Sequence, residues 1–128
     1  MAAAEPQSQL GQALARGQDL TSPLVTELAF EGDPQAMGIL RRAGEYLGVG
    51  ITNYVNIFNP EFVVIGGGAA AAGEMLLQPA REVLLARGLR PNRDQCQIVP
   101  AQFGAEAGMF GAAVMAIDEL LEDVTPED

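Results

Sequence analysis

Three consecutive glycines, Gly66 to Gly68, are the residues of this chain whose type and position best suit ligand chemistry. They follow the apolar run EFVVI at residues 61–65 and precede a run of alanines. Glycine has no Cβ, so a ligand can approach the backbone closely, and free amides at a helix start attract phosphate. Open α/β sheets bind ligands at such strand ends. A tight turn without a ligand explains the same residues equally well, because three glycines alone are a weak signal.

The rest of the composition limits the chemistry that the chain can perform. There is no histidine, and all seven basic residues are arginines, so the commonest general base, the commonest zinc ligand and a phosphate-gripping lysine are missing. We therefore predict no catalytic residue and no metal site. The single cysteine, Cys96, is interpreted as a small core residue because no histidine is present to activate it.

Charge and hydropathy indicate the environment of the chain. A formal net charge of −10 repels phosphate backbones, so we expect no nucleic-acid partner. No apolar run reaches the ~20 residues of a membrane span. The first residues lack the features of a secretion signal. These features predict no membrane association and a cytoplasmic location.

A long helix is predicted ahead of the glycine turn, from about Pro34 to Phe58. Asp33 is its expected N-cap, and Asn59 can end it in the left-handed conformation. Its apolar side chains recur every three to four residues, at Met37, Leu40, Ala43, Leu47, Ile51, Tyr54 and Phe58. Three glycines interrupt it: Gly44, Gly48 and Gly50. Close approach of another backbone explains them best.

The other predicted elements are shorter. Two short helices come first, the second with Ser22 as N-cap and Pro23 at its first position. EFVVI is predicted to be a strand covered on both faces, and QIVP at 97–100 a second strand. Helices follow each strand, at about 73–87 and 104–121. The four arginines near the first of these are interpreted as cations close to a helix C-terminus: Arg81, Arg87, Arg90 and Arg93.

The last helix carries three glycines on one face: Gly104, Gly108 and Gly111. Close packing against a sheet or helix explains them best. The alternative is that the helix start near Gly104 faces the same sheet edge as the glycine turn.

This order of elements predicts an α/β domain that is incomplete. Each strand–helix–strand step implies a right-handed parallel crossover, but two short strands do not complete a parallel sheet. We expect short helices over residues 1–32, an α/β lobe over 33–122 and an acidic tail over 123–128. The unpaired sheet edge favours a homo-oligomer.

The run GDPQAMGILRRAGEYLGVGITNYVNIFNPEFVVIGGG, followed by VPAQFGAEAGMFGAAVMA, resembles the C-terminal part of the ROK family of repressors, open reading frames and sugar kinases. The likeness is greatest to its bacterial glucokinases. It extends over about residues 20–120 and rests on five elements in order: GDP at 32–34, Leu47-Gly48, Asn59-Pro60, the glycine triplet and the GAEAGMFGAA ending.

The resemblance implies the C-terminal lobe of an actin-like ATPase fold, of the ribonuclease-H-like type. It also implies that Gly66, Gly67 and Gly68 contact the adenosine of ATP. The complete enzyme would use ATP with Mg²⁺ to convert glucose, or a related hexose, to its 6-phosphate.

The family's N-terminal phosphate motif, its catalytic Asn-Asp pair and its zinc motif do not occur in this sequence. We therefore expect a fragment: the nucleotide-binding lobe of a ROK-type glucokinase, not catalytic alone and without a zinc site. Two alternatives are the sugar-sensing domain of a ROK-type repressor and a non-catalytic self-association module.

Overall fold

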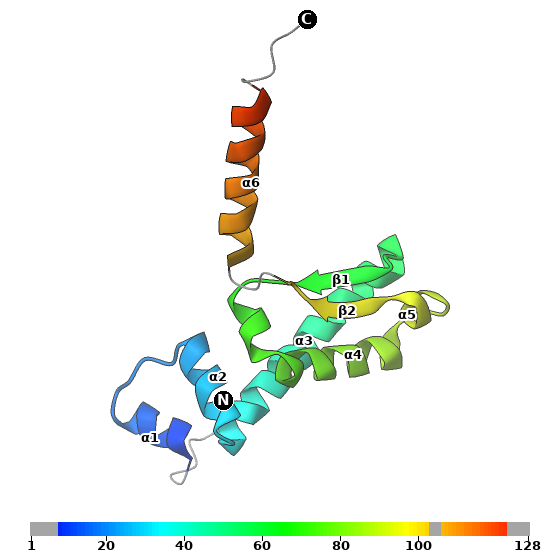
Figure 1. Ribbon diagram of the computed structural model, residues 1–128. Coiled ribbons are helices and arrows are strands. Elements are labelled where there is room, and N and C mark those ends of the chain that lie inside the picture. The colour runs from blue at the N-terminus through cyan, green and yellow to red at the C-terminus, as the bar shows by residue number, and fades with distance from the viewer. Residues whose placement is uncertain (1–7, 103–105, 123–128) are drawn as a thin grey trace, which may run out of the picture.

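The computed structural model describes residues 8–102 and 106–122. Two strands lie over a pair of long helices, two short helices sit at one end of that pair, and the last helix projects away (Figure 1). The elements in chain order are α1 (Gln9–Ala15), α2 (Ser22–Phe30), α3 (Pro34–Phe58), β1 (Phe62–Ile65), the 3-10 helix η1 (Gly68–Ala72), α4 (Glu74–Arg87), α5 (Asn92–Gln95), β2 (Gln97–Pro100) and α6 (Ala107–Glu122). None of the helices in these ranges is long and apolar enough to cross a membrane.

The long helix α3 has the predicted bounds, because both of its ends carry local signals. The carboxylate of Asp33 accepts hydrogen bonds from the amides of Gln35 and Ala36, both at 3.0 Å. Asn59 ends the helix in the left-handed conformation, with φ of 46°. A side-chain cap at the start and a left-handed residue at the end satisfy the backbone groups that a helix leaves unpaired.

The backbones of α3 and α4 touch at two glycines. A Cβ added at Gly48 would lie 2.7 Å from the carbonyl oxygen of Ala80, and one at Gly44 would collide with the carbonyl of Leu76. The predicted close approach is therefore confirmed at these two positions. It is wrong for Gly50, where a Cβ would meet nothing within 4 Å.

The buried face of α3 shares Leu40 and Ile51 with the predicted apolar stripe and is otherwise rotated away from it. Met37, Tyr54 and Phe58 are 45%, 57% and 62% exposed. The buried residues are Ala36, Leu40, Gly44, Gly48, Ile51, Thr52 and Val55. Because the contact with α4 runs along the two glycines, the helix turns its smallest residues inward and leaves large apolar side chains outside.

The two strands pair in parallel, with Phe62 beside Gln97 and Ile65 beside Pro100. Helices α3 and α4 both pack on the same face of this sheet, where their side chains form one cluster with Ile98. The opposite face is open, since Phe62 and Val64 are 55% and 60% exposed. The prediction that this strand is covered on both faces is therefore wrong, because both packing helices lie on one side.

A second cluster of buried residues joins the N-terminal helices to the long pair. Its members come from α1, α2, α3, η1 and α4: Leu10, Val25, Leu28, Ala29, Ala36, Leu40, Ala72 and Leu76. The N-cap of α2 is Thr21 and not Ser22, so that prediction was wrong by one residue. Asp33 ties α1 to α3, because its second carboxylate oxygen accepts a hydrogen bond from the amide of Leu10 at 3.3 Å.

Helix α6 extends away from the other elements (Figure 1). Its glycines Gly108 and Gly111 have no neighbour within 4 Å of an added Cβ, so the predicted close packing at these two positions is wrong. The third glycine of the set, Gly104, and the predicted acidic tail at 123–128 lie outside the described residues.

Candidate functional site

The glycine turn begins where β1 ends, at the carboxyl edge of the sheet. Gly67 has a φ of 74°, in the region that favours glycine, and it caps the 3-10 helix η1 that starts at Gly68. A second glycine with positive φ, Gly73, separates η1 from α4. The predicted helix over about 73–87 is confirmed as α4, whereas the 3-10 helix between the glycine turn and α4 was not predicted.

The fold requires glycine at only one of the three positions of the turn. Position 67 requires glycine because its φ of 74° is strained for any residue with a side chain. Gly68 has neither a positive φ nor a neighbour within 4 Å of an added Cβ, and an added Cβ at Gly66 would make only an ordinary contact, 3.4 Å from the Cβ of Ala101. All three are exposed. Internal packing therefore does not require glycine at positions 66 and 68, and the space in front of Gly68 is open.

The backbone of the turn contains amide groups without a protein acceptor among the described residues. The carbonyl of Gly67 accepts a hydrogen bond from the amide of Ala70 at 3.1 Å, which closes the first turn of η1. In the described part of the chain, the amides of Gly67 and Gly68 donate to no protein oxygen. Exposed N–H groups at the start of a helical turn, without side chains around them, suit an anionic or hydrogen-bond-accepting ligand.

The start of the segment after β2 lies at the same edge as the glycine turn. The amide of Ala101 donates a hydrogen bond to the carbonyl of Ile65 at 2.8 Å, which continues the parallel ladder past the end of both strands. The structure thus places Gly66 beside Ala101. Whether the start of the last helix near Gly104 faces this edge stays a prediction, since residues 103–105 lie outside the described ranges.

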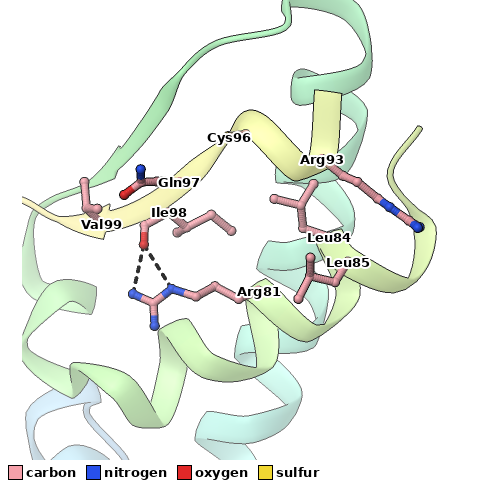
Figure 2. A pocket seen from close by; sticks show the side chains of 8 residues that line it. All are labelled: Arg81, Leu84, Leu85, Arg93, Cys96, Gln97, Ile98 and Val99. Carbon is pink, nitrogen blue, oxygen red and sulfur yellow. Dashed lines mark hydrogen bonds between the residues drawn. The ribbon is translucent and has the colours of Figure 1, made fainter. Parts of the chain in front are cut away.

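Arg81 connects α4 to β2. Its Nε and Nη2 donate hydrogen bonds of 3.0 and 2.8 Å to the carbonyl oxygen of Ile98 (Figure 2). Its Nη1 pairs with the carboxylate of Glu74. Glu74 is the first residue of α4, directly after the turn region. The interpretation of Arg81 as a cation at a helix C-terminus is therefore wrong, whereas Arg87 does occupy the last turn of α4.

A hollow of about 290 Å³ lies next to Arg81, between α4 and the outer edge of β2. Figure 2 shows the residues that line it: Arg81, Leu84, Leu85, Arg93, Cys96, Gln97, Ile98 and Val99. Both arginines are already engaged, since Arg93 donates to the carbonyl of Gly88 at 3.4 Å and lies 3.5 Å from the carboxylate of Asp94. We therefore interpret this hollow as structural.

Cys96 is half-buried and packs against the cluster beneath the sheet. Burial raises the pKa of its thiol above the ordinary value of 9.0, so the thiol stays protonated and unreactive. This agrees with its interpretation as a small core residue. Among the described residues, no three His, Cys, Asp or Glu side chains come together as a group that could hold a metal ion.

Sequence reasoning did not identify the role of Arg81. One signal was available: Arg81 lies within a turn of Leu77 and Leu84, two fully buried residues of the inward face of α4. A charged residue on an otherwise apolar helix face is expected to have a specific partner.

A model of the ROK family matches residues 4–119 of the chain. The chain belongs to the ROK family. Two ROK relatives with assigned functions differ in what they do. The xylose repressor of Caldicellulosiruptor bescii is 31% identical over 103 residues, which are 80% of this chain and 26% of that protein. The glucokinase of Halalkalibacterium halodurans is 36% identical over 92 residues, 72% of this chain and 28% of that protein.

The ROK fold is also seen in a solved structure. The ROK glucokinase of Streptomyces griseus, in complex with glucose and AMPPNP, superimposes with a TM-score of 0.61 at 33% identity, over 71% of this chain and 30% of that one. The present chain spans about a quarter of the length of its two ROK relatives. It is an α/β chain with a short parallel sheet, related to both ROK kinases and ROK repressors.

Proposed function

We propose that this chain is the nucleotide-side, C-terminal lobe of a ROK-type glucokinase. The complete enzyme would transfer a phosphoryl group from ATP, with Mg²⁺, to glucose or a related hexose. The observation that carries the proposal is the pair Gly66 and Gly68, which neither the backbone conformation nor internal packing requires. The 36% identity to a glucokinase and the likeness to a glucokinase solved with glucose and AMPPNP support it.

The chemistry of the turn suits an adenine nucleotide. The absence of side chains at Gly66 and Gly68 leaves room for a flat base or a sugar to lie against the main chain. The unpaired amides of Gly67 and Gly68 would be donors for ribose or phosphate oxygens. In this proposal, the residues of the chain bind and orient the nucleotide, and Mg²⁺ is bound together with the phosphates.

The proton acceptor for the sugar hydroxyl would come from outside this chain. Phosphoryl transfer depends on positioning and on charge stabilisation around the phosphates. The sequence lacks the family's phosphate motif and its Asn-Asp pair. We therefore expect nucleotide binding but no transfer from this chain alone, so a coupled assay should give no glucose-dependent ADP release above a heat-inactivated control.

Calorimetric titration of the purified chain with Mg-ATP tests the assignment of the turn. Gly68→Val should weaken binding about tenfold or more, because its side chain would fill the space in front of the turn. Gly50→Val is the matched control, since Gly50 is also an exposed glycine with open space around it but lies on α3. Both variants should keep melting temperatures near that of the parent chain. Equal affinity of the two variants would show that the glycine turn does not bind ATP.

A ROK repressor is the second candidate, because a xylose repressor is 31% identical over 80% of this chain. In that case, the lobe would form part of a sugar-sensing domain. A ligand that binds the folded state raises the melting temperature. Stabilisation by xylose or glucose without nucleotide would favour the repressor, whereas stabilisation by Mg-ATP that Gly68→Val abolishes would favour the kinase.

A further inference from the structure

We infer that Arg81 and Pro100 together close the outer edge of β2 to pairing with a strand of another chain. The outer edge is the side of β2 that faces away from β1. An unpaired sheet edge presents N–H and C=O groups to which strands of other molecules can bond, and charged side chains and prolines prevent this. The inference does not depend on the proposed function.

The pairing of β2 with β1 determines which backbone groups lie on the outer edge. The amides of Gln97 and Ala101 donate hydrogen bonds of 2.9 and 2.8 Å to carbonyl oxygens in and next to β1. In a parallel ladder, both backbone groups of a residue point to the same side, and successive residues point to opposite sides. The N–H and C=O groups of Gln97, Val99 and Ala101 therefore face β1. Those of Ile98, and the C=O group of Pro100, belong to the outer edge.

Arg81 occupies the main acceptor on this edge. Its Nε and Nη2 donate to the carbonyl oxygen of Ile98 at 3.0 and 2.8 Å (Figure 2). Its Nη1 pairs with the carboxylate of Glu74, so the guanidinium group is held from two sides. Two donors use both lone pairs of the Ile98 oxygen. The side chain of Arg81 is 31% exposed, so an approaching strand would meet a cation beside an acceptor that is already bonded.

Pro100 removes a donor from the same edge. Proline has no backbone N–H, and within sheets it is confined to edge strands, with that side toward solvent. Just before β2, the amide of Cys96 is also used, because it donates to the carbonyl of Asn92 at 3.1 Å. Of the outer-edge positions 96, 98 and 100, only Ile98 keeps an amide without a partner among the described residues.

Two copies of β2 illustrate why pairing fails. If the strands met in antiparallel orientation about Val99, each Ile98 would lie opposite Pro100 of the other copy, and the two residues would exchange two hydrogen bonds. Arg81 already bonds the acceptor of one of these, and Pro100 lacks its donor, so half of the bonds cannot form. The self-association expected from an unpaired sheet edge is thereby excluded at β2.

The edge formed by β1 lacks both features. Phe62 and Val64 direct their backbone groups away from β2, and in residues 8–102 and 106–122 no hydrogen bond to these groups is formed. The sequence of β1, FVVI, contains neither a proline nor a charge. The closure is therefore specific to β2 and does not follow from the small size of the sheet.

Disulfide trapping tests the closure. The reporter chain carries Val99→Cys in a Cys96→Ser background. In antiparallel pairing about residue 99, the two new thiols would face each other with Cα atoms about 4.5 Å apart, a distance that a disulfide spans. The reporter chain should form almost no linked dimer under mild oxidation. Arg81→Met with Pro100→Val should raise the rate of dimer formation about tenfold or more, because the acceptor is released and the donor restored.

Three controls separate strand pairing from aggregation of a weakened fold. Pro100→Val alone keeps Arg81 and should link no faster than the reporter chain. Gly48→Ala in the reporter chain weakens the fold at the crossing of α3 and α4, away from β2, and should not link. Gln97→Cys, in place of Val99→Cys in the double variant, would lie about 13 Å along the strands from its copy and should not link either.

Three results would overturn the inference. The first is a linked dimer of the reporter chain itself, which would show that the edge is open. The second is the absence of a dimer in the double variant, which would show that Arg81 and Pro100 do not close the edge. The third is equal linking of the double variant and any one of the controls.

Hydrogen exchange of the parent chain provides a measurement that needs no variant. The amide of Ile98 should exchange at the same rate at low and at high protein concentration, because no strand of another chain pairs with it. Protection of this amide that grows with protein concentration would show that the outer edge pairs, and would contradict the inference.

Discussion

The guanidinium group of Arg81 donates two hydrogen bonds to the carbonyl oxygen of Ile98, 3.0 Å from Nε and 2.8 Å from Nη2. At the start of β2 the amide of Gln97 donates to the carbonyl of Glu61, and just after β2 the amide of Ala101 donates to that of Ile65. Because alternate residues of a strand point to opposite edges, the carbonyl of Ile98 faces away from β1. Arg81 thus occupies the outer edge of β2 at the place where a neighbouring strand would bond.

Replacement of Arg81 should destabilise the fold. Arg81→Met keeps much of the apolar stem but removes the donors to Ile98, so the free energy of unfolding should fall by about 1.5–3 kcal/mol, as for a hydrogen bond from a charged group. Urea denaturation measures the loss. Arg87→Met is the control, because Arg87 is exposed in the last turn of α4 and should cost about 0.5 kcal/mol or less. Equal losses would mean that the contact with Ile98 contributes nothing.

Alanine should have opposite effects at Gly48 and Gly50. A Cβ at Gly48 would lie 2.7 Å from the carbonyl oxygen of Ala80, so Gly48→Ala should cost about 1–3 kcal/mol through overpacking. Gly50 has open space around it in the same helix, and Gly50→Ala should stabilise by about 0.5–1 kcal/mol. Chemical denaturation of both variants checks the difference. A stabilised Gly48→Ala would show that the helices do not cross as closely as described.

The carboxyl group of Asp33 should make the free energy of unfolding depend on pH. Burial alone would raise the pKa of its carboxyl group, but hydrogen bonds from the backbone amides of Ala36, Leu10, Gln9 and Gln35 outweigh burial and lower the pKa below the ordinary 3.8. A folded-state pKa below the unfolded value stabilises the fold above the unfolded pKa, and this contribution is lost as the pH falls through the folded pKa.

The test of this dependence is a series of unfolding measurements from neutral pH down to acid pH. Asp33→Asn keeps the capping shape without the charge, so its unfolding free energy should fall less below about pH 4 than that of the parent chain. Asp33→Ala should lose about 0.5–2 kcal/mol already at neutral pH, because it removes the cap. If the unfolding free energies of the parent chain and Asp33→Asn changed equally with pH, the carboxylate of Asp33 would contribute nothing to the pH dependence.

Cys96 should react slowly with iodoacetamide in the native chain. Burial raises the pKa of its thiol above 9.0, and the thiolate is the nucleophile. Alkylation in urea should be about tenfold faster or more than in native buffer. The comparison chain carries Val64→Cys in the Cys96→Ser background, which places its thiol on an exposed residue and should react at similar rates in both solvents. Fast native alkylation of Cys96 would contradict the half-buried position.

Local signals explain which parts of the fold were predictable. The bounds of α3 follow from Asp33 at its start and Asn59 with Pro60 at its end, and these residues act through contacts with their neighbours in sequence. The strand at 97–100 was predicted from a short apolar run bounded by other elements. The buried face of α3 was not predictable in this way, since contact with α4 at Gly44 and Gly48 overrides the spacing of large apolar residues.

The candidate site was predictable in place but not in detail. The position of the glycine turn at a strand end follows from sequence, and so does the need for glycine at a left-handed position, which the structure assigns to Gly67. That Gly66 and Gly68 have no internal reason to be glycine depends on what surrounds them in three dimensions. The pairing of Arg81 with Ile98 likewise joins residues 17 positions apart, through helix-to-strand packing that no local pattern encodes.

The glycine crossing of α3 and α4 has a mechanical consequence. Packed helices slide past each other when the side chains between them exchange rotamers, as in shear motions. Gly44 and Gly48 of α3 lie against the backbone of α4 and the Cβ atoms of Pro79 and Val83, so α3 places no side chain of its own there whose rotamer change would permit such sliding. The two helices, and the strands that follow each of them, therefore move as one rigid body.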